Sequence, residues 1–124
     1  MFRQDCSHHL LTTILPFWEN LTDWERGGWF GYVNHDLSVA RDAHKGCILN
    51  SRILWTFSTA ARVTGDKSLL RYARHAFASL PHFEDTERGG VYWSVTADGE
   101  PLDKTKHTYC QAFAIYGLAA YMRA

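Results

Sequence analysis

An internal repeat constrains this chain more than any other feature of its sequence. The segment Asp23-Trp-Glu25-Arg26-Gly27-Gly28 recurs as Asp85-Thr-Glu87-Arg88-Gly89-Gly90, displaced by 62 positions. Five of the six residues are identical, which is typical of a repeated structural unit. The chain therefore contains two related units rather than one irregular domain.

The residues after each copy predict a short β-hairpin. The runs 29–33 and 91–95 are rich in aromatic and β-branched residues, as short strands are. Asp98-Gly99 is a strong tight-turn signal within the second hairpin. Beyond the hairpins we align the copies at an offset of 59, so that Leu54 faces Phe113 and each unit spans about sixty residues.

The remaining segments are helical by their periodicity. Residues 6–18 carry one apolar face with Pro16 at a last turn or a kink, whereas residues 46–63 and 107–123 are apolar on nearly all sides. Asp66 can cap a helix whose apolar stripe lies opposite Arg71 and Arg74. The order is outer helix, hairpin, inner helix, repeated, which predicts an all-α fold of the α/α toroid type.

Two helix pairs cannot close such a ring. We therefore expect residues 1–124 to be the N-terminal portion of one barrel domain, with repeat units at about 1–64 and 65–124. The last residues still follow a helical pattern without a glycine stop. The expected partner of residues 1–124 is then the remaining part of their own barrel. Where the next helix pair would pack, we expect exposed apolar surface that promotes association.

Composition excludes several classes of function. Thirteen Lys and Arg balance thirteen Asp and Glu, so no bulk field exists to bind nucleic acid or an anionic membrane. No apolar run is long enough to span a bilayer, and the N-terminal residues lack the core of a signal peptide. We expect a soluble, cytoplasmic protein.

Cysteine and histidine spacing argues against disulfides and metals. Cys6, Cys47 and Cys110 form an odd set without a C-x-x-C pair, so we expect buried or half-buried free thiols. The seven histidines show neither an i,i+4 pair nor an H-E-x-x-H motif. The sequence predicts no metal site.

Arg52 is the main candidate for chemistry. It lies in the first half of the apolar helix 46–63, where a guanidinium keeps its charge and needs acceptors. A buried ion pair and a ligand-binding role are equally good interpretations of that position. The toroid favours ligand binding, because inner helices line its central cavity.

The repeat places further polar groups near Arg52. At the offset of 59, Tyr109 lies opposite Asn50 and Gln111 opposite Arg52, so all four belong to the first turns of the two inner helices. We call this end of the helix pair the rim. Together with Trp93 these side chains are typical of sugar recognition, in which hydroxyl groups take hydrogen bonds and aromatic faces cover the ring.

Five ordered motifs resemble one known family. Residues 15–18, 27–33, 45–58, 89–95 and 108–114 are similar to the N-terminal part of the cellobiose 2-epimerases, which belong to the N-acylglucosamine 2-epimerase superfamily. The resemblance implies an (α/α)6 barrel. Six sixty-residue units need roughly 360 residues, of which this chain supplies about two units.

The resemblance also implies a reaction. These enzymes invert C2 of the reducing-end glucose of β-1,4-linked disaccharides, through an enediolate and without a cofactor. Arg52 matches the arginine that contacts the oxygens of the reacting sugar, and Tyr109 matches a tyrosine of the substrate site. Asn50, Gln111 and Trp93 are additional substrate-binding candidates. The resemblance assigns the acid and base to two histidines of the later barrel, so we expect residues 1–124 alone to be inactive.

Two alternative functions remain open. An aldose–ketose isomerase of the mannose type on the same barrel would share Arg52 and the enediolate but return the proton to C1. A non-catalytic helical-repeat module would use the same concave surface to bind a glycan or a protein.

Overall fold

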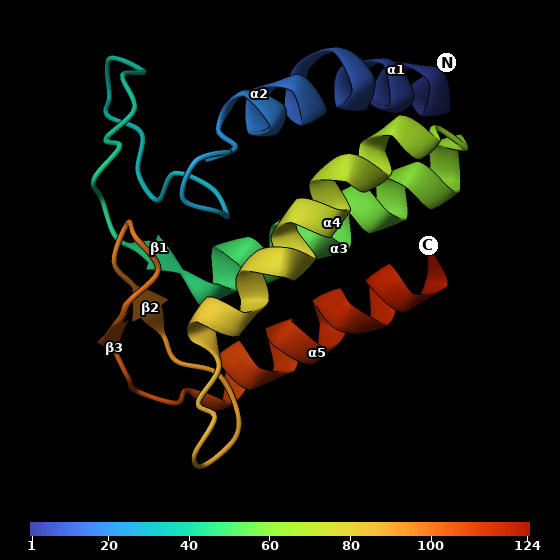
Figure 1. The fold of residues 1–124 in the computed structure, drawn as a ribbon. Helices are drawn as coiled ribbons and strands as arrows, with labels where there is room; N and C mark the ends of the chain where they lie inside the picture. The colour runs from blue at the N-terminus through green and yellow to red at the C-terminus, as the bar shows by residue number, and fades with distance from the viewer.

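The computed structural model describes residues 1–124 as five α-helices and one small sheet (Figure 1). The helices are α1 (Phe2–His9), α2 (Leu15–Asn20), α3 (Cys47–Thr64), α4 (Leu70–Ser79) and α5 (Thr108–Arg123). The strands are β1 (Lys45–Gly46), β2 (Ser94–Val95) and β3 (Pro101–Asp103). The fold is helical with few strands, as the sequence predicts.

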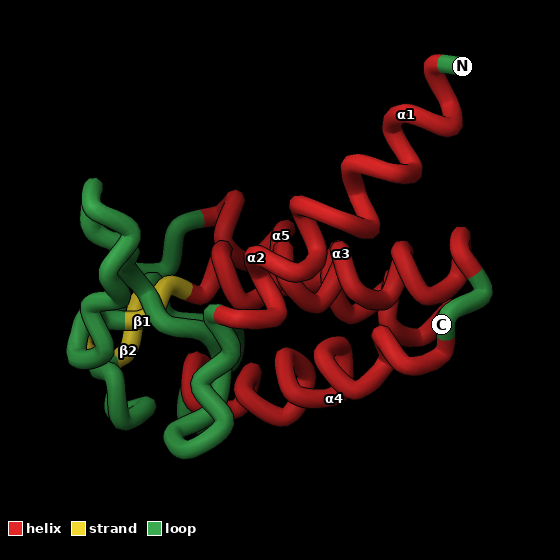
Figure 2. The backbone as a smooth tube through the Cα atoms, turned by 90° about the horizontal axis from the view of Figure 1, so that it is seen from above, coloured by secondary structure: helices red, strands yellow, loops and turns green.

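Helix α3 forms the centre of the molecule, and α4 and α5 run alongside it (Figures 1 and 2). Its bounds agree with the predicted inner helix 46–63, and half of its residues are buried. Phe57, which is fully buried, stacks between Trp29 at 6.1 Å and Tyr72 at 4.8 Å, measured between ring centroids. Burying such a side chain stabilises the fold by roughly 1.5–3 kcal/mol.

Helix α4 has the amphipathic character of an outer helix. Asp66 caps its start as predicted, because the Asp66 carboxylate accepts a hydrogen bond from Ser68 N at 2.9 Å. The cap opens a 3-10 turn, Lys67–Leu69, that leads into α4. Ala73 and Ala76 are buried on one face of α4, while Arg74 is exposed on the other.

The first outer helix is continuous from α1 to α2 but is not regular. The segment Leu10–Ile14 is π-helical, and it stands directly before Pro16 in the first turn of α2. Proline lacks the N–H that an α-helical turn uses, so a widened turn is a reasonable accommodation. Pro16 thus lies beside an irregular stretch of the helix rather than in its last turn, and the helix extends further on both sides than residues 6–18.

The sheet differs in part from the predicted hairpins. Strands β2 and β3 form the second hairpin around Gly99, as the Asp98-Gly99 signal predicts, with a bulge at Ser94 and Val95. The first hairpin has no strand: 29–33 forms only isolated bridges such as Val33 with Val39. Strand β1 instead pairs antiparallel with β2, which ties the start of α3 to the second hairpin.

The predicted offset of 59 between the inner helices is wrong. Lys45 and Lys106 make equivalent contacts just before α3 and α5. Asn50 and Gln111, further along, place their amide oxygens beside the equivalent glycines Gly28 and Gly90, and both pairs lie 61 positions apart. Arg52 therefore faces Phe113 and not Gln111. Apolar residues match at several offsets in helices that are apolar on most sides, whereas the polar contacts fix a single register.

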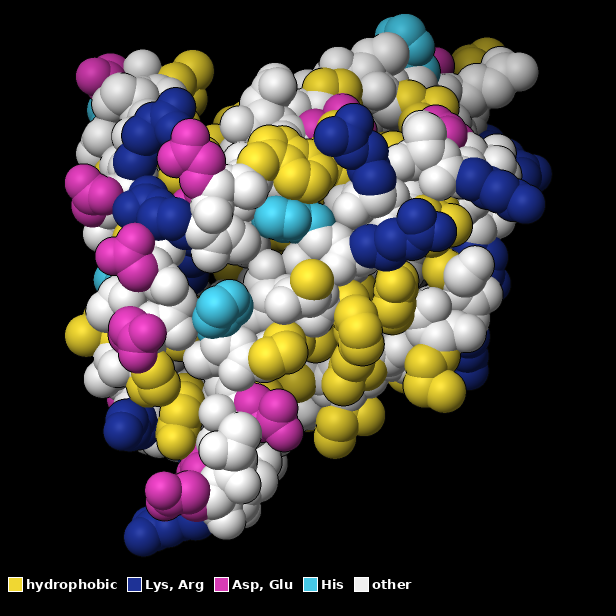
Figure 3. All heavy atoms as spheres, in the orientation of Figure 1, with side chains coloured by type: hydrophobic (Ala, Val, Ile, Leu, Met, Phe, Trp, Pro, Cys, Tyr) yellow, Lys and Arg dark blue, Asp and Glu magenta, His cyan; other side chains and the backbone are white.

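Part of the apolar surface remains exposed. A groove of about 440 Å³ between α4 and α5 is lined by Phe77, Leu80, Pro81, Glu84, Gly90, Val91, Gln111, Ala114, Ile115 and Leu118. Hydrophobic side chains gather over this region in Figure 3. None of the five helices combines the length and the apolar character that crossing a membrane requires. Cys47 and Cys110 are buried free thiols as expected, whereas Cys6 is exposed.

Candidate functional site

A buried ion pair fixes the first D-x-E-R-G-G segment, residues 23–28, against the start of α3. We call residues 23–28 the first turn and the equivalent residues 85–90 the second turn. The carboxylate of Asp23 accepts hydrogen bonds from the backbone N–H groups of Glu25 and Arg26 through Oδ1. Its Oδ2 accepts from Lys45 Nζ at 2.7 Å, and Lys45 Nζ also donates to Gly27 O at 2.7 Å. Burial raises the pKa of Asp23, but the bonds from Lys45 and Arg26 outweigh burial and hold that pKa below its usual value.

The second copy repeats these contacts in a more exposed setting. Asp85 Oδ1 accepts from the N–H groups of Glu87 and Arg88, and Lys106 Nζ lies 2.5 Å from Asp85 Oδ2 and 2.6 Å from Gly89 O. The hydrogen bond from Lys106 is the main cause that lowers the pKa of Asp85 to about 2. Each turn thus holds the N-terminal end of its own inner helix, which fixes the rim.

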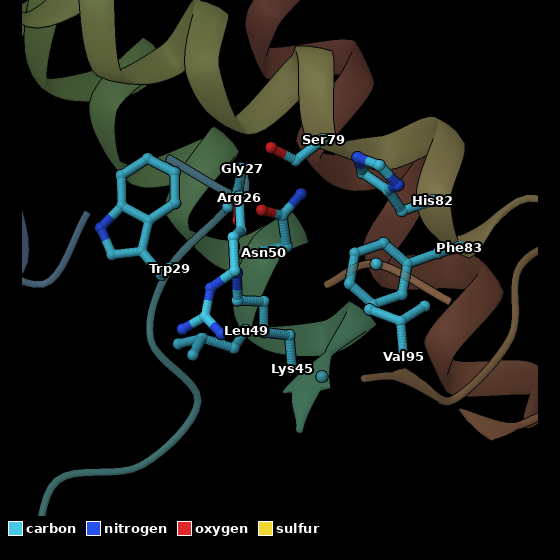
Figure 4. A pocket seen from close by; sticks show the side chains of 13 residues that line it. Arg26, Gly27, Trp29, Lys45, Leu49, Asn50, Ser79, His82, Phe83 and Val95 are labelled. Carbon is cyan, nitrogen blue, oxygen red and sulfur yellow. The ribbon is translucent and has the colours of Figure 1, made fainter. Parts of the chain in front are cut away.

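Two predicted substrate residues, Asn50 and Gln111, make hydrogen bonds to the backbone of other segments. Asn50 is 3% exposed, and its Nδ2 donates to Ala76 O at 2.9 Å. Its Oδ1 has no partner and points into a small hollow beside Ser79 (Figure 4). Gln111 binds the backbone of Val91 twice, accepting from its N–H and donating to its carbonyl, both at 2.7 Å.

Arg52 is an exposed, unpaired cation. It lies in the second turn of α3 and forms no hydrogen bond or ion pair with any other residue of 1–124, so the buried ion pair that its sequence position left open is not made within these residues. The guanidinium of Arg52 makes a cation–π contact with the ring of Phe113 on α5, at 6.0 Å from Arg52 Cζ to the ring centroid. All five N–H donors of this guanidinium are therefore available to a ligand.

An aromatic cluster continues from Phe113 along the rim. Tyr109, which is 52% exposed, lies 6.3 Å from Phe113 and 5.8 Å from Trp93, measured between ring centroids. His107 contacts the ring of Trp93 at 4.5 Å. We call these four residues the rim cluster: Trp93, His107, Tyr109 and Phe113. The structure thus brings Arg52, Tyr109 and Trp93 into one connected surface.

A hollow of about 200 Å³ adjoins the rim cluster. It is lined by Gly31, His44, Gly46, Ile48, Leu49, Trp93 and Ser94. No carboxylate, ammonium or guanidinium group lines it, so a neutral ligand meets no desolvation cost from a buried charge there. A cation, a phenol and aromatic faces beside an uncharged hollow suit a polyol that acquires negative charge during a reaction.

No metal centre is present among these residues. The structure holds no group of three or more His, Cys, Asp or Glu side chains that could coordinate an ion. His107 has only aromatic neighbours in the rim cluster. Within residues 1–124, the rim presents the guanidinium of Arg52 and the phenol of Tyr109 to a ligand.

Sequence reasoning missed two features of this site. Phe113 was paired with Leu54 and not with Arg52, because the offset of 59 placed Gln111 opposite Arg52. Lys45 and Lys106 went unnoticed as a pair, although each stands directly before the first helical stretch that follows a D-x-E-R-G-G segment. That repeated lysine was the signal that could have given the correct offset.

Comparison with known proteins identifies relatives of the whole chain. A family model described as N-acylglucosamine 2-epimerase (GlcNAc 2-epimerase) matches residues 28–124. A cellobiose 2-epimerase of Eubacterium cellulosolvens is 53% identical over 116 residues, covering 93% of this chain and 29% of the relative. A cellobiose 2-epimerase of Ruminococcus albus is 46% identical over 123 residues, covering 98% of this chain and 31% of the relative.

Solved structures agree with these relatives. The cellobiose 2-epimerase of Bacillus thermoamylovorans superposes with a TM-score of 0.97 at 44% identity, covering 99% of this chain and 32% of that one. A D-mannose isomerase superposes with a TM-score of 0.76 at 24% identity, covering 88% of this chain and 28% of that one, and this likeness concerns the fold alone. The chain spans about 30% of the length of the relatives that it matches.

Proposed function

The chain belongs to the N-acylglucosamine 2-epimerase family, and from this membership we propose that it forms part of a sugar 2-epimerase. The proposed reaction converts the reducing-end glucose of cellobiose-type β-1,4-linked disaccharides to mannose. The substrate class rests on relatives that are named cellobiose 2-epimerase and are 46–53% identical to this chain.

Epimerisation at C2 makes one demand that this chain can meet. A base removes the proton at C2 of the open-chain sugar, next to the aldehyde, and an acid returns a proton to the opposite face. Between the two steps the C1 and C2 oxygens carry the negative charge of an enediolate. A fixed cation beside those oxygens lowers the barrier, because it interacts more strongly with the enediolate than with the neutral sugar.

The unpaired state of Arg52 is the observation that carries the proposal. A guanidinium that is already bound to a carboxylate has little charge left for a substrate, whereas Arg52 has no such partner. Arg52 also lies on the side of α3 that adjoins the rim cluster. In the proposed mechanism, Arg52 donates hydrogen bonds to the developing enediolate.

The other predicted residues take supporting parts. Tyr109 presents its exposed phenol beside Phe113, and it would hydrogen-bond a sugar hydroxyl. Trp93 lines the uncharged hollow and would cover the apolar face of a sugar ring. Asn50 and Gln111 enter only indirectly, because the amide of Asn50 binds α3 to α4 through the Ala76 carbonyl and the amide of Gln111 holds the backbone of Val91 after the second turn.

We assign residues 1–124 to the first part of an (α/α)6 barrel, with repeat units at about 1–64 and 65–124. The repeated turns and inner helices support this architecture, as does the share of each relative that the chain spans. Acid and base would come from histidines outside these residues, and no cofactor takes part. Free thiols at Cys47 and Cys110 suit a reducing compartment, so we place the enzyme in the cytoplasm.

Product analysis of a fused enzyme tests the proposal. Residues 1–124 would replace the matching N-terminal third of the Eubacterium cellulosolvens relative, and the fusion would be incubated with cellobiose. We expect 4-O-β-D-glucosyl-D-mannose as the main product, identified by NMR spectroscopy. A ketose as the main product would instead establish an isomerase, and disaccharide binding without turnover would establish a binding module.

The isolated chain provides the complementary result. Residues 1–124 alone should give no mannose epimer from cellobiose, because the proposed acid and base lie elsewhere. Turnover by this chain at a rate comparable with that of the fused enzyme would contradict the assignment of acid and base to residues outside it.

A further inference from the structure

Arg52 faces an aromatic ring where an arginine on a helix surface often faces a carboxylate. The guanidinium Cζ lies 6.0 Å from the centroid of Phe113, which is half-buried on the neighbouring inner helix α5. One helical turn further on, Trp55 of α3 stacks on Tyr116 of α5 at 5.4 Å and 14°. The two inner helices therefore meet in successive facing pairs, each 61 positions apart in sequence.

The choice of a ring has an electrostatic consequence. The face of a phenyl ring attracts a cation through its quadrupole, yet it carries no net charge. A carboxylate at the same place would fix the guanidinium but would also neutralise it. Arg26 illustrates that case, because its guanidinium is shared between Asp23 and Asp42. Phe113 can hold Arg52 in one orientation and leave its full charge for a ligand.

Phe113 also contacts the second residue of the proposed site. Tyr109 precedes it by one helical turn on α5, and the two rings meet edge to face at 6.3 Å and 75°. Residues four apart on a helix lie on the same face, so this contact follows from the sequence spacing. The ring of Phe113 therefore contacts both Arg52 and Tyr109, whereas the ring of Tyr116 stacks on Trp55.

We propose that Phe113 is a positioning residue for sugar epimerisation, which holds the guanidinium of Arg52 and the phenol of Tyr109 toward the same ligand without neutralising Arg52. This inference rests on the proposed function. Phe113 itself takes no part in proton transfer and acts through Arg52 and Tyr109.

The contact can be measured in the 124-residue chain by NMR spectroscopy. A ring current shifts protons above a phenyl face upfield, so the Hδ and Hε resonances of Arg52 should lie upfield of those of an exposed arginine such as Arg74. Phe113→Leu should remove this shift, while Tyr116→Leu should keep it. Circular dichroism checks that both variants retain their helices. Arg52 resonances that are equal in wild type and Phe113→Leu would overturn the proposed contact.

The fused enzyme tests the consequence for catalysis. Phe113→Leu should lower kcat roughly 2- to 30-fold with a smaller change in KM, because a cation–π contact is worth about 0.5–2 kcal/mol and Arg52 acts on the transition state. Phe113→Trp should restore most of the loss. Tyr116→Leu, the matched control, should keep the wild-type kcat.

The outcomes separate this inference from the proposed function. A wild-type fusion that does not epimerise cellobiose contradicts the proposed function, while the Arg52 resonances still decide whether Phe113 holds the guanidinium. An active fusion in which Phe113→Leu and Tyr116→Leu lower kcat equally contradicts the positioning role. Failure of Phe113→Trp to rescue kcat contradicts it as well.

Discussion

The two D-x-E-R-G-G turns have the same hydrogen bonds but not the same surroundings. In the first turn the side chains of Asp23 and Lys45 are 3% and 7% exposed, whereas Asp85 and Lys106 in the second turn are 9% and 31% exposed. The first turn is also bound by His75 of α4, whose Nε2 lies 3.1 Å from Asp23 O and 3.2 Å from Gly28 O. No histidine makes such a contact with the second turn.

The same sequence motif can therefore contribute different amounts to the free energy of unfolding in its two copies. Both aspartates order the turn and anchor a lysine before an inner helix. A buried charge that loses its partner has no water to replace it, whereas a partly exposed ammonium regains hydration. The turns should therefore respond unequally to the same substitution.

Asp23→Ala is expected to have the largest effect. It leaves the ammonium of buried Lys45 without a carboxylate, and breaking a buried pair in this way costs about 3–5 kcal/mol. Asp85→Ala should cost clearly less, because Lys106 is already in contact with solvent. Urea unfolding of the 124-residue chain, followed by circular dichroism, measures both losses. Equal losses would show that burial does not separate the two turns.

A double substitution sharpens this result. Asp23→Leu with Lys45→Met removes both charges together, and buried ion pairs replaced by apolar groups are often neutral in stability. The double variant should thus be more stable than Asp23→Ala. If it is no more stable, the loss in Asp23→Ala comes from the unpaired turn N–H groups and not from the stranded ammonium.

Gln111→Asn should produce the next largest effect. The shorter amide cannot reach Val91, so two hydrogen bonds are lost at about 0.5–1.5 kcal/mol each. The amide proton of Val91 should then exchange faster with solvent, which hydrogen-exchange NMR detects. Gln111→Glu keeps the length and the acceptor but loses the donor, so its effect should lie between those of wild type and Gln111→Asn. Unchanged exchange at Val91 in Gln111→Asn would contradict the anchoring role.

Mild acid should act on the first turn only. Burial lowers the pKa of His75, although its hydrogen bonds to the Gly28 and Asp23 carbonyls oppose that shift. The folded pKa thus lies below the unfolded value of about 6.5, so the unfolded chain binds the extra proton and stability falls as the pH decreases from about 7.5 toward 5.5. His75→Gln should lessen that fall in the urea midpoint. A fall of the same size in His75→Gln would place its origin elsewhere.

Stronger acid should remove the stabilising contribution of Asp85 in the second turn. The folded pKa of Asp85 is about 2, against about 3.9 for an unfolded aspartate, so its contribution is complete above about pH 4 and is lost as the pH falls toward 2. Asp85→Asn should therefore lose less stability than wild type between pH 4 and pH 2, as measured by thermal unfolding. Parallel pH profiles of the two proteins would argue against the Asp85–Lys106 contact.

The sequence predicts the helical elements well because their signals are local. Apolar periodicity locates α3 and α5 within one or two residues, Asp66 marks the cap before α4, and Asp98-Gly99 marks the second hairpin. Strand β1 escapes prediction, because two residues that pair with a distant strand leave no periodic pattern.

The candidate site is predicted only in part for a related physical reason. Arg52 and Tyr109 are recognisable as polar or aromatic groups at the start of inner helices, and Trp93 as an aromatic residue of the second hairpin. Asn50 and Gln111 resemble them in type, but their partners are backbone groups of distant segments, Ala76 of α4 and Val91, that sequence spacing does not reveal. Phe113 looks like any other apolar residue of α5 until the correct register places it opposite Arg52.

The central claim is that Arg52 stabilises an enediolate formed at C2 of a sugar, and isotope exchange tests it most directly. The fused enzyme would be incubated with cellobiose in D2O, and deuterium at C2 of the reducing-end sugar would be measured by NMR spectroscopy. We predict exchange in wild type and in Arg74→Ala, an exposed arginine of the outer helix α4, and a roughly 10²- to 10³-fold slower exchange in Arg52→Ala. Exchange in Arg52→Ala at the Arg74→Ala rate would contradict the claim.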